Sequence, residues 1–88
     1  MKFGRWFMIN FKTEIIKKGD NLWYIGCETE GPIYIIKALE TQEKPLGLFK
    51  CTVILGEQKH SYVFWPNSAM SFVRISNTEL EFLRMLYE

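Results

Sequence analysis

The chain has 88 residues, of which 48% are hydrophobic and 24% charged, a balance typical of one globular domain spanning residues 1–88 rather than of a disordered segment. Its formal net charge of +1 gives no bulk attraction to nucleic acid or anionic lipid. No uncharged stretch approaches the length of a membrane span, and no small-residue cleavage site follows the start, so the sequence predicts a cytoplasmic protein.

The first segment, residues 7–15, carries apolar side chains at every second position, which predicts a strand. A recurrence at every fourth position also fits a helix, but Thr13 and the β-branched isoleucines favour the strand. The sequence Lys-Gly-Asp-Asn at 18–21 predicts a hairpin turn, because these residue types tolerate positive φ.

Five more short segments alternate apolar and polar residues and are bounded by glycine, proline or asparagine. The predicted strands are 22–28, 33–40, 48–55, 61–65 and 70–75. Residues 48–55 alternate most clearly, with Phe49, Cys51, Val53 and Leu55 expected on one face. Cys27 and Cys51 are expected to be small buried thiols, and they could pair only if their strands lie close together.

The end of the chain changes character. The sequence Ser-Asn-Thr-Glu at 76–79 matches a capping box, which predicts a helix of about three turns. The expected apolar stripe comprises Leu80, Leu83 and Tyr87, broadened by Phe82 and Leu86. The fold class is therefore α+β and β-rich, a five- to six-stranded antiparallel meander with one C-terminal helix packed on it. A small SH3-like barrel and a curled sheet both satisfy this plan.

No residue pattern carries catalysis. His60 is the one histidine and is expected in an exposed turn, whereas Cys51 is expected to face the core, so a nucleophilic pair is not predicted. The cysteines and histidine lack the pairwise spacing of a zinc site, and the glycines are scattered at turns rather than gathered in a phosphate-binding loop. The sequence predicts a non-enzyme with no cofactor and no metal.

Aromatic residues point to binding. Three tryptophans, four tyrosines and seven phenylalanines make up 16% of the chain, and adjacent rings such as Phe64 and Trp65 lie on opposite faces of a strand. The helix can cover one set only, so the other is expected to form a protein-binding surface unless the sheet closes. The predicted function is a small inhibitor or adaptor that occludes a partner protein, of the phage or plasmid counter-defence, antitoxin or immunity type.

The predicted contact residues are three indole anchors and three lysines that would set orientation and on-rate: Trp6, Trp23, Trp65, Lys12, Lys17 and Lys18. A homodimer through an open strand edge or the exposed aromatic face is a companion prediction. The alternative function is binding of single-stranded nucleic acid by a small β-barrel, with bases stacked on exposed rings. The basic residues expected to supply charge for it are Arg5, Lys12, Lys50 and Arg74. The ten acidic residues that accompany eleven basic ones count against it.

Overall fold

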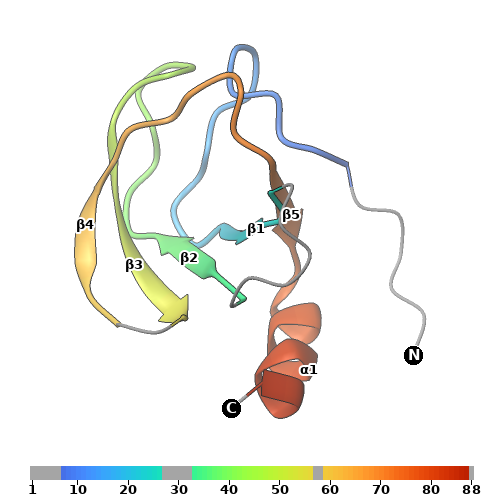
Figure 1. Ribbon diagram of the computed structural model, residues 1–88. Coiled ribbons are helices and arrows are strands. Elements are labelled where there is room, and N and C mark those ends of the chain that lie inside the picture. Colours follow the sequence, from blue (N-terminus) through green and yellow to red (C-terminus); the bar gives the residue numbers. More distant parts are fainter. Residues whose placement is uncertain (1–6, 27–32, 57–58, 88) are drawn as a thin grey trace.

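A computed structural model of the chain describes residues 7–26, 33–56 and 59–87 (Figure 1). These ranges form one sheet of five antiparallel strands in the order β4-β3-β2-β1-β5, followed by one helix. The elements are β1 Asn21–Tyr24, β2 Ile35–Ala38, β3 Phe49–Leu55, β4 Ser61–Phe64, β5 Phe72–Ile75 and α1 Asn77–Tyr87. The predicted fold class is thus confirmed, and the sheet is open rather than closed into a barrel.

The sheet curves around an inner core, as Figure 1 shows, and the segment before β1 lies against that core. At its centre the Phe72 ring makes edge-on contacts with Phe11 and Phe64, with ring centroids 6.1 and 5.5 Å apart. The inner core comprises Ile9, Phe11, Ile16, Leu22, Ile36, Ala38, Phe49, Cys51, Val53, Phe64 and Phe72. We call the opposite side of the sheet the outer face.

A second core lies between the outer face and α1. The helix-side core comprises Ile35, Leu55, Val73, Ile75, Leu80 and Leu83. Leu55 reaches it because of a β-bulge: Ile35 pairs with Leu55 but Ile36 pairs with Val53, so one residue of β3 is skipped. An extra residue reverses the alternation that follows it. Leu55 therefore does not share the face of Phe49, Cys51 and Val53, which corrects the sequence prediction.

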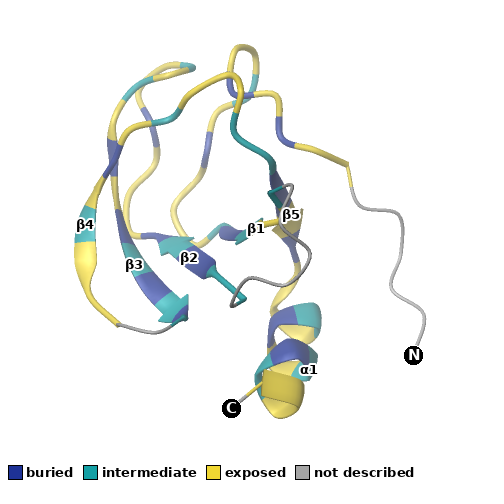
Figure 2. Cartoon of the chain, in the orientation of Figure 1, coloured by how far each residue is buried: buried dark blue, intermediate teal, exposed yellow. Residues whose placement is uncertain are grey.

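The start of α1 is the capping box that the sequence predicts. The Ser76 amide donates to the Glu79 carboxylate at 2.8 Å, and the Glu79 amide donates to the Ser76 hydroxyl at 3.1 Å. Leu80 and Leu83 are buried. Leu86 and Tyr87, expected on the buried stripe, are exposed by 59% and 61%, because the last turn of α1 projects beyond the sheet (Figure 2).

The predicted strand over 7–15 is wrong. The Asn10 side chain accepts a hydrogen bond from the Lys12 amide, and the Asn10 carbonyl accepts one from the Glu14 amide, which turns the chain at the point where a strand would have to continue. This segment forms no strand of the sheet and pairs with β5 through an isolated bridge between Met8 and Val73 and the hydrogen bond from the Ile9 amide to the Phe72 carbonyl. The turn at 18–19 is confirmed, with Gly19 at φ 92°, but residues 7–17 form no strand that would complete a hairpin.

A buried amide fixes the long loop before β3 to the segment before β1. The Gln42 side-chain oxygen accepts from the Ile16 amide at 2.8 Å, the Gln42 amide donates to the Ile16 carbonyl at 2.8 Å, and its side-chain nitrogen donates to the Gly47 carbonyl. These hydrogen bonds satisfy the polar groups of Gln42 within the fold, so the role of this residue is structural.

Some predicted features lie outside the described residues. They are the end of the predicted strand 22–28 together with Cys27, the turn that follows it up to residue 32, and residues 57–58 of the turn before β4.

Candidate protein-binding surface

The part of the outer face that α1 does not reach carries exposed apolar side chains. Lys50 on β3 pairs with Val63 on β4, and the Leu39 amide donates to the Lys50 carbonyl at 2.8 Å. Phe49 pairs with Phe64, which brings Leu48 and Trp65, the residues just beyond that pair, beside each other. We call this surface the outer patch; it comprises Leu39, Leu48, Lys50, Val63 and Trp65.

Strand alternation explains why the members of the outer patch face solvent. Phe49, Cys51 and Phe64 point into the inner core and are buried, so the residues between them point outward. Leu39, Leu48, Val63 and Trp65 are exposed by 41%, 46%, 45% and 70%. Isolated exposed apolar residues are ordinary, but four gathered around one lysine are typical of a binding surface.

The outer patch borders an open sheet edge. The Val53 amide donates to the His60 carbonyl, so the backbone groups of residues 60, 62 and 64 point toward β3. Because backbone direction alternates along a strand, those of Ser61, Val63 and Trp65 point away from the sheet. In the described part of the chain β4 has β3 as its one neighbour. Figure 2 colours much of this strand as exposed.

The opposite edge is protected. The Ile9 amide donates to the Phe72 carbonyl at 2.8 Å, and Met8 bridges to Val73, so the segment before β1 lies along β5. At the β4 edge, residues 61–65 include no charged side chain, although charges are a common means by which proteins discourage pairing at an edge. The β5 edge is therefore covered, whereas the β4 edge is uncharged and open to pairing with another strand.

The predicted contact residues that the structure describes do not come together in one place. Trp23 on β1 is half-buried and packs against the helix-side core, and two strands separate β1 from β4, where Trp65 follows. Lys12 lies in the turn at 11–13, whereas Lys17 and Lys18 lie at the turn before β1; all three are exposed. Trp6 lies outside the described residues. Trp65 is thus the predicted anchor that lies within the outer patch.

Sequence reasoning did not place Lys50 or its three aliphatic neighbours in the protein-binding surface, and named Lys50 only among the basic residues of the nucleic-acid alternative. A signal was present, because the same alternation that buries Phe49 and Cys51 must turn Leu48 and Lys50 outward. What the sequence did not specify is which part of the outer face α1 covers. The Lys50 ammonium makes no ion pair with any described residue, so its charge is available to a ligand.

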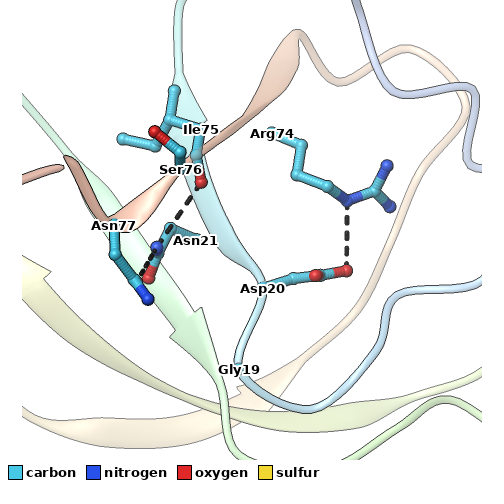
Figure 3. A pocket seen from close by; sticks show the side chains of 7 residues that line it. All are labelled: Gly19, Asp20, Asn21, Arg74, Ile75, Ser76 and Asn77. Carbon is cyan, nitrogen blue, oxygen red and sulfur yellow. Dashed lines mark hydrogen bonds and ion pairs between the residues drawn. The ribbon is translucent and has the colours of Figure 1, made fainter. Parts of the chain in front are cut away.

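An open depression of about 420 Å³ lies beside the start of α1 (Figure 3). The guanidinium of Arg74 pairs with Asp20 at 3.1 Å and with Glu14 at 3.2 Å, and the Asn21 side-chain nitrogen donates to Asn77 at 2.9 Å. Among the described residues, Asn21 Oδ1 is the buried side-chain oxygen that lacks a hydrogen bond. These ion pairs and hydrogen bonds fasten the start of β1 to β5 and to the start of α1.

Burial also removes Cys51 from chemistry. Its side chain is fully buried, and desolvation raises the pKa of the thiol, which keeps it protonated and a poor nucleophile. Tyr62 pairs with Cys51 across the two strands. Burial and the hydrogen bond with the Tyr34 hydroxyl, at 2.5 Å, raise the pKa of Tyr62. The exposed His60 ring packs on Tyr62 with centroids 5.3 Å apart. These contacts describe a packed cluster rather than a catalytic pair.

Comparisons with protein-family models, curated proteins and solved structures find no match to this chain. Within residues 7–26, 33–56 and 59–87, no three acidic, histidine or cysteine side chains gather as metal ligands would. The helix in these ranges is too short to span a bilayer. The outer patch and the β4 edge are therefore the features on which a function can be argued.

Proposed function

We propose that this chain is a non-enzymatic protein-binding module that inhibits or adapts a partner by occluding part of the partner's surface. The outer patch is the contact surface and Trp65 its anchor. The observation that carries the proposal is the 70% exposure of the Trp65 side chain beside three other exposed apolar residues. Such a ring costs little to order on binding and is a common source of interface affinity.

The composition of the outer patch specifies the partner's chemistry. An apolar pocket is needed for the indole, with aliphatic contacts for Leu39, Leu48 and Val63. A carboxylate opposite Lys50 would complement the unpaired ammonium and speed association. The inhibitor or adaptor role of the phage, plasmid or immunity type belongs to this proposal, because a protein that binds through an exposed apolar surface covers the part of the partner that it contacts.

An affinity capture from the native host, after nuclease treatment, tests the proposal. Wild type should retain a specific protein, and Trp65→Ala should lose it while remaining folded, because the indole supplies the buried contact. Tyr87→Ala is the matched control, since this ring is 61% exposed on α1 and outside the outer patch. Equal capture by wild type and Trp65→Ala would contradict the proposal.

Single-stranded nucleic acid is the second candidate, favoured by the position of the Trp65 ring beside the unpaired Lys50. A base could stack on the indole while a phosphate contacts the ammonium. Two other rings and one other cation are engaged within the fold, because the Tyr34 and Tyr62 hydroxyls form a hydrogen bond with each other and Arg74 pairs with two carboxylates.

Salt separates the two candidates. Binding of an oligothymidylate, followed by tryptophan fluorescence, would weaken steeply as salt rises if phosphates dominate. Capture of a protein through the apolar outer patch should change little over the same salt range. Salt-sensitive oligonucleotide binding that is lost in Trp65→Ala would support the second candidate over the first.

A further inference from the structure

We propose that two copies of this chain associate by pairing their β4 edges antiparallel, around a two-fold axis at Val63. The two sheets then become one continuous sheet. The occupant of the open edge is thus a second copy, and this inference goes beyond the proposed function because it concerns the purified protein alone.

The backbone supplies the first argument. Ser61, Val63 and Trp65 direct their amide and carbonyl groups away from β3, as the Val53 to His60 hydrogen bond requires. In a two-fold pairing centred on Val63, each Val63 bonds to its counterpart, and Ser61 bonds to Trp65 of the second copy. Each such pair exchanges two hydrogen bonds. Pro66 does not interrupt this ladder, because its position in the alternation faces β3.

The side chains are self-complementary in this register. On the outer face the large Trp65 lies opposite the small Ser61 of the second copy, and the two Val63 side chains meet at the axis. On the inner face Tyr62 lies opposite Phe64 of the second copy. Aromatic and β-branched cross-strand pairs are among those that stabilise sheets most. One sequence therefore satisfies both sides of the interface, as an isologous contact demands.

Charge does not oppose the association. Residues 61–65 are uncharged, so no like charges meet at the axis. The nearest lysine on the outer face is Lys50, one strand inward from Val63. The two copies of Lys50 would be separated by three strand spacings, roughly 14 Å, which exceeds the screening length of about 8 Å at physiological salt.

Sedimentation equilibrium on the purified chain tests the proposal. Wild type should have twice the 10.5 kDa mass of one chain and dissociate on dilution. Val63→Glu and Val63→Lys should each weaken the dimer by about tenfold or more, because like charges then meet at the axis. Mixing the two variants should restore a dimer. Met85→Glu, at an 81% exposed position on α1, is the control and should dimerise as wild type does.

Crosslinking tests the register. In a chain that also carries Cys27→Ser, oxidation of Val63→Cys should join two copies, since the two positions would face each other at a separation that a disulfide can span. Ser61→Cys should not crosslink, because its counterpart lies four residues away along the strand, roughly 13 Å. A wild type that stays monomeric at high concentration would overturn the proposal, as would equal crosslinking at both positions.

Failure here is distinct from failure of the proposed function. Dimerisation is measured on the purified chain alone, whereas partner capture is measured by comparing wild type with Trp65→Ala and Tyr87→Ala. Lys50→Glu separates them further, because Lys50 lies away from the two-fold contact: it should reduce capture of a partner with an acidic contact while the dimer persists. If capture fails and the dimer forms, the proposed function alone is lost.

Discussion

The two halves of the outer face differ in what covers them rather than in how they are built. Near β1 and β5 the outward residues Trp23, Val73 and Ile75 lie under α1 and join the helix-side core. Near β3 and β4 the outward residues Lys50, Val63 and Trp65 meet solvent. Both halves follow the same alternation of a strand. Burial at a given outward position is therefore decided by where α1 lies on the sheet, not by the alternation within the strand.

The largest expected effect is on stability, and it distinguishes the part of α1 that packs on the sheet from the last turn of α1, which projects beyond it. Leu83→Ala should lower the free energy of unfolding by about 2–5 kcal/mol, because it leaves a cavity against buried neighbours in the helix-side core. Leu86→Ala, at a 59% exposed position three residues along the same helix, should cost less than about 0.5 kcal/mol. Urea denaturation followed by circular dichroism measures both. Equal losses would show that the last turn of α1 is also packed.

Trp23 and Trp65, the two tryptophans that the structure describes, allow the covered and exposed halves of the outer face to be compared. Trp23→Ala should destabilise the fold by about 1–3 kcal/mol, since the ring is half-buried against the helix-side core and its removal loses apolar burial. Trp65→Ala should change stability by less than about 0.5 kcal/mol, yet abolish partner capture. Thermal denaturation measures the change in stability of each variant, and the capture experiment measures whether each variant still binds the partner. Should Trp23→Ala stay fully stable and lose capture, Trp23 would be an anchor, as the sequence predicts.

The sequence predicts those parts of the fold whose determinants are local. Ser76 and Glu79 specify the start of α1 because a capping box acts within one turn, and the alternation around Phe49 and Cys51 specifies β3. The strand over 7–15 failed because Asn10 offers the backbone a competing turn. The bulge that turns Leu55 toward α1 has no residue signature, since it depends on pairing with β2.

In the candidate site, too, the features that depend on local sequence were predicted and those that depend on distant contacts were not. Trp65 was predicted as an exposed anchor because alternation sets it opposite the buried Phe64. Lys50 was predicted only as a cation for nucleic acid and not as part of a protein-binding surface, because its place in the outer patch depends on Leu39 and Val63 approaching from neighbouring strands. Trp23 shares the aromatic character of Trp65, and only the position of α1 distinguishes them.

A smaller effect is expected at the start of α1, the element that makes the covered half different. Ser76→Ala removes the hydroxyl that accepts from the Glu79 amide and should cost about 1 kcal/mol, the usual value of an N-cap. Ser68→Ala, an exposed serine in the loop before β5, is the control and should be neutral. Guanidinium denaturation of both variants measures the difference. A neutral Ser76→Ala would mean that packing alone holds α1 on the sheet.

The smallest expected effect concerns charge on the two halves. Arg74 on β5 pairs with Glu14 and Asp20, but its side chain and that of Glu14 are 37% and 38% exposed, so the pairs are worth little. Arg74→Gln should therefore cost about 0.2–1 kcal/mol at low salt, and less as salt screens the pairs. Lys50→Gln should leave stability unchanged within about 0.5 kcal/mol, because that ammonium has no carboxylate to lose. Urea denaturation at low and high salt compares them. If Lys50→Gln stabilised or destabilised the fold in a salt-dependent way, Lys50 would be part of an internal pairing, and its availability to a partner would have to be given up.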